Sequence, residues 1–80
     1  MPLSLTLYTR PGCHLCEDAE EWLCEAAAAA GAELLLVSIL DDLAVYERYK
    51  WRIPVVEFAG RAWEAPLPEA EIRAALAAGG

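Results

Sequence analysis

The sequence of 80 residues contains no asparagine and no glutamine, and it is poor in basic side chains. Lys and Arg together number 6 against 13 Asp and Glu, which gives a formal net charge of −7. Binding to nucleic-acid phosphates needs a basic face on the protein, and this charge balance argues against one. We therefore expect no DNA or RNA partner.

Long apolar runs are also missing. No segment approaches the roughly 20 apolar residues that span a bilayer, and the start, "MPLSLTLYTR", has no positively charged beginning of the kind found in signal peptides. We expect a cytoplasmic protein with no membrane contact, in a compartment where stable disulfides are unusual. The 3 cysteines, an odd number, further argue against a disulfide scaffold.

What the chain does contain is hydrophobic residues, 58% of the total, in patterns that alternate between strand and helix. They predict a single domain over residues 1–80 with the element order β-α-β-α-β-β-α. Strands are expected at 3–9, 33–40, 53–59 and 61–65, and helices at 14–30, from 43 to about 50, and within 66–80. A parallel β-α-β unit followed by a hairpin predicts an α/β fold, a four-stranded mixed sheet with helices on both faces.

Finer features of these elements are also predicted. Gly31 is expected to end the first helix, and Asp42 to cap the second. The nearly all-apolar segment 33–40 is typical of a strand covered on both faces. Cys24 is interpreted as a small buried hydrophobe, with a regulatory thiol as the alternative. It lies about 12 Å along the helix from Cys16, at 1.5 Å per residue, and cannot bridge to it.

Cys13 and Cys16 form a C-x-x-C where the first strand runs into the first helix. Unpaired backbone N–H groups and the helix dipole stabilise an anion there, and the thiolate is the nucleophilic form of cysteine. Cys13 is thus predicted to attack, and the buried Cys16 to resolve the mixed disulfide. A structural disulfide and a zinc half-site are the alternatives. Zinc takes four ligands, which His14 and Cys24 do not obviously complete within one chain.

The segment "LYTRPGCHLC" resembles the active-site strand, loop and helix start of glutaredoxins, and "RIPVV" resembles their second motif. In that family the second motif holds a cis proline against the C-x-x-C. The resemblance covers nearly the whole chain and implies a thioredoxin-like, glutaredoxin-type fold and a small thiol–disulfide oxidoreductase. It also implies a cis Ile53–Pro54 bond in a loop whose backbone pairs with an extended substrate. The alternative for Pro54 is a trans proline that begins an edge strand.

The chain departs from that family in two places. Glutaredoxins that use glutathione resemble one another in a Gly-Gly-x-Asp segment, whereas this region contains only Gly60 and no Asp after it. Arg52 stands where the family usually has Thr. The expected partners are therefore a protein substrate with a disulfide and an upstream thiol reductant, with poor use of glutathione.

Several charged residues are candidates for the rim of the site. Arg10 and Arg52 are expected to lie on the Cys13 side and attract a negatively charged partner surface. Arg48 and Lys50 are interpreted as ordinary solvated charges at a helix end.

Two further residues have open roles. His14 either stabilises the Cys13 thiolate or is an exposed polar side chain, and Trp51 either packs internally or forms part of a docking patch. We expect a monomer without a cofactor or a bound metal. A metal or iron–sulfur carrier, for which a second chain would supply further ligands, and a non-catalytic docking module remain the alternative functions.

Overall fold

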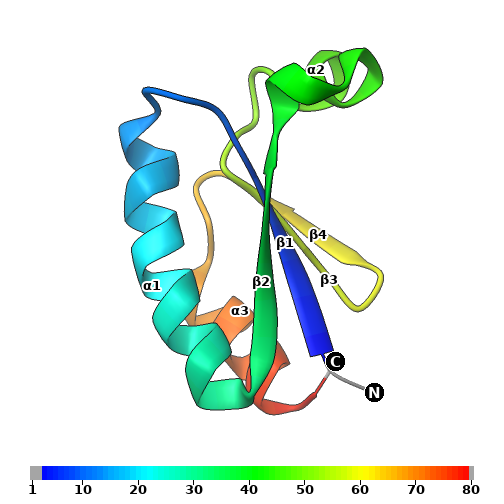
Figure 1. The fold of residues 1–80 in the computed structure, drawn as a ribbon. Coiled ribbons are helices and arrows are strands. Elements are labelled where there is room, and N and C mark those ends of the chain that lie inside the picture. The colour runs from blue at the N-terminus through cyan, green and yellow to red at the C-terminus, as the bar shows by residue number, and fades with distance from the viewer. Residues whose placement is uncertain (1–2, 80) are drawn as a thin grey trace.

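The computed structural model describes residues 3–79 and has the predicted order of strands and helices (Figure 1). The strands are β1 (Leu3–Thr9), β2 (Ala32–Ser38), β3 (Val55–Phe58) and β4 (Arg61–Glu64). The helices are α1 (His14–Ala30), α2 (Leu43–Tyr49) and α3 (Glu69–Ala77), with a short 3₁₀ turn, η1 (Ile39–Asp41), before α2. Within the described part of the chain, no helix has both the length and the apolar character needed to cross a membrane.

The four strands form one mixed sheet in the order β2-β1-β3-β4. β1 and β2 run parallel, with Leu5 opposite Leu34, because α1 carries the chain back to the end at which β1 began. β1 with β3 and β3 with β4 are antiparallel pairs, and the hairpin turns at Ala59 and Gly60. The predicted α/β architecture is confirmed.

Neighbouring side chains along a strand point to opposite faces of a sheet, so β1 and β3 supply two separate cores. On one face Leu7 and Val56 pack with Leu23 of α1. On the other face Val55 packs with Tyr49 of α2. Figure 1 shows α1 and α3 along the first face, while α2 lies near one end of the sheet. The prediction of helices on both faces is therefore confirmed.

The strand β2 is more exposed than its sequence predicts. Leu35 is 40% exposed and Leu36 is 49% exposed. β2 lies at the edge of the sheet, and α2, with 7 residues, covers only part of the second face. The prediction that this strand is covered on both faces is wrong. An apolar run in the sequence does not show how much of the sheet surface the helices cover.

Helix α1 buries the side that its sequence pattern indicates, including Ala19, Leu23 and Ala27. Cys24, however, is exposed, so its interpretation as a buried hydrophobe is wrong. Successive residues turn by about 100° around a helix of 3.6 residues per turn. Cys24 therefore points away from the sheet although its neighbour Leu23 lies fully inside.

Both predicted helix ends are confirmed. Gly31 ends α1 with a φ of 70°. This left-handed backbone conformation favours glycine, because a side chain with a Cβ is strained in it. Asp42 begins α2, and its Oδ1 accepts hydrogen bonds from the N–H groups of Ala44 at 2.8 Å and Val45 at 3.2 Å. These bonds satisfy two donors that the helix leaves unpaired.

We predict that Asp42→Ala lowers the free energy of unfolding by about 1 kcal/mol, since it removes the cap of α2. The matched control is Asp41→Ala, which removes the same charge one residue earlier at an exposed position. We expect this control to change stability by less than about 0.5 kcal/mol. Urea unfolding measures both values, and equal losses in the two variants would contradict the assignment of the cap.

Candidate functional site

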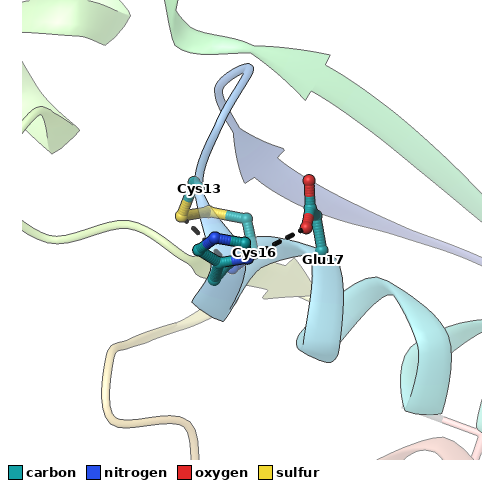
Figure 2. The surroundings of a disulfide bond; sticks show 4 residues. Cys13, Cys16 and Glu17 are labelled. Carbon is teal, nitrogen blue, oxygen red and sulfur yellow. Dashed lines mark hydrogen bonds and ion pairs between the residues drawn. A yellow bond between two sulfur atoms is a disulfide. The ribbon is translucent and has the colours of Figure 1, made fainter.

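The loop between β1 and α1 places Cys13 at the start of the helix. Gly12 has a φ of 78°, so the chain turns there before Cys13 returns to an extended conformation as the N-cap of α1. Cys13 and Cys16 are joined by a disulfide, and their Cα atoms lie 5.2 Å apart (Figure 2). One helical turn thus brings the two sulfur atoms of the C-x-x-C together.

The first turn of α1 directs backbone donors at this cysteine. The Cys16 N–H donates to Sγ of Cys13 at 3.2 Å, and the Glu17 N–H donates to the Cys13 carbonyl at 3.0 Å. A donor aimed at the sulfur, at the positive end of the helix dipole, stabilises a thiolate.

The two cysteines differ in accessibility. Cys16 is only 1% exposed, whereas Cys13 is partly exposed to solvent. Of the two cysteines, Cys13 is therefore the one that solvent reaches, and Cys16 lies inside.

His14 is placed on the outside of the helix start. Its side chain is 95% exposed, and Nδ1 lies 3.4 Å from Oε1 of Glu17. The recorded partner of the imidazole is thus a carboxylate rather than a sulfur atom. This position matches the alternative in which His14 is an exposed polar side chain. The other alternative, that His14 stabilises the Cys13 thiolate, stays a prediction.

The loop before β3 lies beside the C-x-x-C. The Ile53–Pro54 peptide bond is cis, and Pro54 is buried. The Tyr49 carbonyl holds this loop by accepting the N–H groups of Arg52 at 2.8 Å and Ile53 at 3.2 Å.

Pro54 also borders a groove that Leu15, the residue before Cys16, borders from α1. We call this hollow the Pro54 groove. Its volume is about 220 Å³, and it is lined by Leu15, Asp18, Ala19, Trp22, Pro54, Ala65, Pro66 and Leu67. The fold thus brings together two motifs that lie some forty residues apart in the sequence.

The two predicted rim arginines lie among acidic groups. Nη1 of Arg52 is 2.9 Å and 3.0 Å from the two carboxylate oxygens of Glu64, so its charge is paired on β4. Arg10 is exposed and lines a different hollow, which it shares with Glu17, Glu20 and other residues between α1 and β2. A basic patch shared by Arg10 and Arg52 stays a prediction. Neither the pairing of Arg52 with Glu64 nor the position of Arg10 in a different hollow supports it.

The remaining basic candidates and the tryptophan are on the surface around α2. Lys50 forms an ion pair with Glu47 at 3.0 Å, as expected of a solvated helix end. Trp51 is 88% exposed, so it does not pack internally. Its position on the surface is the one that the docking-patch alternative requires.

A tyrosine–glutamate–tyrosine network, which the sequence pattern does not predict, lies on the second face of the sheet. Glu57 accepts hydrogen bonds from the hydroxyl groups of Tyr8 at 3.0 Å and Tyr49 at 2.8 Å. Burial, with the Glu57 carboxylate beside it, raises the pKa of Tyr8 to about 12. The pKa of Tyr49 is also raised, mainly because the side chain is buried and secondly because its hydroxyl bonds to the Glu57 carboxylate.

This network connects the end of β1, from which the Cys13 loop departs, to the residue whose carbonyl holds the Pro54 loop. A lone glutamate inside the apolar strand "VVEF" was the available sequence signal. Its two partners could not be found in that way, because they come from different elements.

Residues 3–79 contain no group of three or more His, Cys, Asp or Glu side chains arranged to hold a metal ion. The third cysteine, Cys24, points outward from α1.

A four-stranded mixed sheet with a C-x-x-C at the start of its first helix defines a thioredoxin-like fold of the glutaredoxin type. A family model described as a glutaredoxin-like domain (DUF836) matches residues 4–77, and the chain belongs to this family. None of the curated proteins compared with the chain matches it.

Two solved proteins are similar to it in sequence and fold. The X-ray structure of XcR50 from X. campestris is 40% identical, with 92% of this chain and 96% of that chain covered and a TM-score of 0.75. The NMR structure of Ne2328 from Nitrosomonas europaea is 27% identical, with 94% and 92% covered and a TM-score of 0.73. These likenesses confirm the expected fold, and the family match confirms the resemblance to glutaredoxins.

We predict that in the reduced protein Cys13 is alkylated at neutral pH at least several-fold faster than Cys24, and that Cys16 reacts most slowly. Cys13 has a backbone donor on its sulfur, Cys24 is exposed but in mid-helix, and Cys16 is buried. Mass spectrometry after short exposure to iodoacetamide measures the three rates. Equal rates for Cys13 and Cys24 would contradict a special role for the helix start.

Proposed function

We propose that the protein is a small thiol–disulfide oxidoreductase in which Cys13 attacks and Cys16 resolves. The observation that carries this proposal is the Cys13–Cys16 disulfide at the start of α1, with the Cys16 N–H directed at Sγ of Cys13. The contrast between a partly exposed and a buried cysteine supports the division of roles.

The reaction proceeds in two exchanges. The Cys13 thiolate attacks one sulfur of the substrate disulfide, a bond forms between them, and the other substrate sulfur leaves as a thiolate. Cys16 then loses its proton and attacks Sγ of Cys13, which releases the second substrate sulfur. Two electrons pass to the substrate, and the Cys13–Cys16 disulfide remains until an external thiol reductant restores both thiols.

The Pro54 loop supplies the surface for the substrate backbone. The Ile53 N–H already donates to the Tyr49 carbonyl, so we assign pairing with an extended substrate to the Ile53 carbonyl. Pro54 has no N–H of its own and closes the groove beside Leu15.

The proposed partners are a protein with a disulfide and an upstream thiol reductant, in a reducing compartment such as the cytoplasm. The chain has no Gly-Gly-x-Asp after its hairpin, and the segment that follows β4 contributes Ala65, Pro66 and Leu67 to the Pro54 groove. Their side chains offer no polar group to the γ-glutamyl end of glutathione.

We predict that Cys16→Ser retains mixed disulfides on Cys13, because the resolving thiol is missing. Cys13→Ser should form none at that position, and Cys24→Ser is the matched control with an exposed cysteine outside the site. The variants are incubated with a peptide disulfide, and adducts are counted by non-reducing mass spectrometry. Adducts that accumulate equally in Cys24→Ser and Cys16→Ser would contradict the assigned roles.

We also predict that glutathione is a poor electron donor. With a small mixed disulfide as substrate, the protein should accelerate the reaction with glutathione little beyond the uncatalysed rate, and the reaction with dithiothreitol clearly. The physical reason is the apolar wall of the Pro54 groove described above. Similar acceleration with both donors at equal thiol concentration would show that glutathione binds through other groups.

A further inference from the structure

The Pro54 groove is small and mostly apolar. Its volume of about 220 Å³ lies below the roughly 300–1,000 Å³ of typical small-molecule sites. One wall comes from α1, and the other comes from the Pro54 loop and the segment before α3. A hollow of this size and character fits one bulky apolar side chain better than it fits a large polar ligand.

The groove adjoins the C-x-x-C through Leu15, while Cys13 and Cys16 themselves are not among its lining residues. Leu15 stands between the two cysteines in sequence and is 65% exposed, so it forms an edge shared by the disulfide and the groove. Pro54 faces that edge from the opposite wall. A peptide joined to Cys13 as a mixed disulfide therefore has the residues next to its cysteine beside this hollow.

The charge at the groove is negative. Asp18 is its one charged lining residue, and it makes no hydrogen bond or ion pair within residues 3–79. Two basic residues that neighbour groove residues are already paired with other carboxylates. Arg73, which lies over the ring of Trp22, bonds to Glu69 at 2.8 Å, and Arg52 bonds to Glu64 at 2.9 Å. An unpaired carboxylate beside an apolar hollow complements a basic group next to an apolar one.

We propose that the Pro54 groove selects disulfide-bonded protein segments that carry a bulky apolar residue and a basic residue beside the reacting cysteine. The apolar side chain fills the groove, and the basic group faces Asp18. This inference rests on the proposed redox function and specifies its substrate class.

The test uses the pre-reduced full-length protein and short peptides whose single cysteine is blocked with thionitrobenzoate. Cys13 attacks the peptide sulfur, thionitrobenzoate leaves as a coloured thiolate, and Cys16 then releases the peptide thiol. Four peptides carry Leu or Gly on one side of the cysteine and Lys or Glu on the other, and the reversed order is also made. Each rate is divided by the rate of Cys13 alkylation in the same variant, which corrects for effects on the thiolate itself.

We expect the Leu peptides to react about tenfold faster than the Gly peptides at limiting concentration. Lys should exceed Glu by up to about fivefold, equivalent to about 1 kcal/mol at 1.4 kcal/mol per factor of ten. Asp18→Lys should reverse the preference for Lys over Glu. Glu25→Lys, with the same change of charge at an exposed position further along α1, should keep it. Leu67→Ala should weaken the preference for Leu, and circular dichroism checks that each variant is folded.

The outcomes separate the two proposals. Two results together support the groove as the docking site. The unchanged protein prefers Leu peptides to Gly peptides, and the preference for Lys over Glu is lost or reversed in Asp18→Lys but not in Glu25→Lys. Equal rates for all peptides, or the same charge preference in Asp18→Lys as in the unchanged protein, would overturn the groove proposal and leave the redox function intact. Absence of thionitrobenzoate release from every peptide, while Cys13 is alkylated normally, would overturn the redox function and the substrate class with it.

Discussion

The packing of α1 against the sheet is the constraint on which the rest of this structure depends. Leu23 and Ala27 seat the helix on Leu5 and Leu7 of β1, and this contact fixes both the direction and the rotation of the helix. Its N-terminus consequently lies at the carboxyl end of β1, one short loop away. The same rotation turns Cys16 inward to 1% exposure. A single apolar contact surface therefore creates the difference between the two cysteines.

The opposite face of the sheet organises the second half of the site. Tyr8 and Tyr49 both bond to Glu57, and the Tyr49 carbonyl in turn holds the Ile53 N–H. The loop that carries Cys13 and the loop that carries Pro54 are thus attached to one hydrogen-bonded cluster. A carboxylate that is placed among tyrosines accepts two hydroxyl donors, which offsets the cost of removing it from water.

The acidic character of the chain has a local meaning at this site. Acidic residues on the first turns of α1, among them Glu17, lie at the favourable end of the helix dipole. Most basic groups form ion pairs such as Arg52–Glu64 and Arg61–Glu71. The expectation of a basic rim failed to find support because net charge and sequence position do not reveal which carboxylate an arginine meets.

The sequence by itself determined the order of the elements, the end of α1 and the start of α2, because these depend on local signals: apolar periodicity, the Asp42 cap, the positive φ of Gly31 and the turn at Gly60. The end of β2 was not determined in this way, since Ile39 and Leu40, expected in a strand, form the 3₁₀ turn η1. The sequence also determined that Cys13 stands at a helix start, since strand, loop and helix are contiguous there. Only the tertiary structure decided what depends on distant partners. Leu35 and Leu36 are exposed because β2 is an edge strand. Cys24 points outward because the seating of α1 sets its rotation, and the Pro54 groove exists because three separate segments close around one hollow.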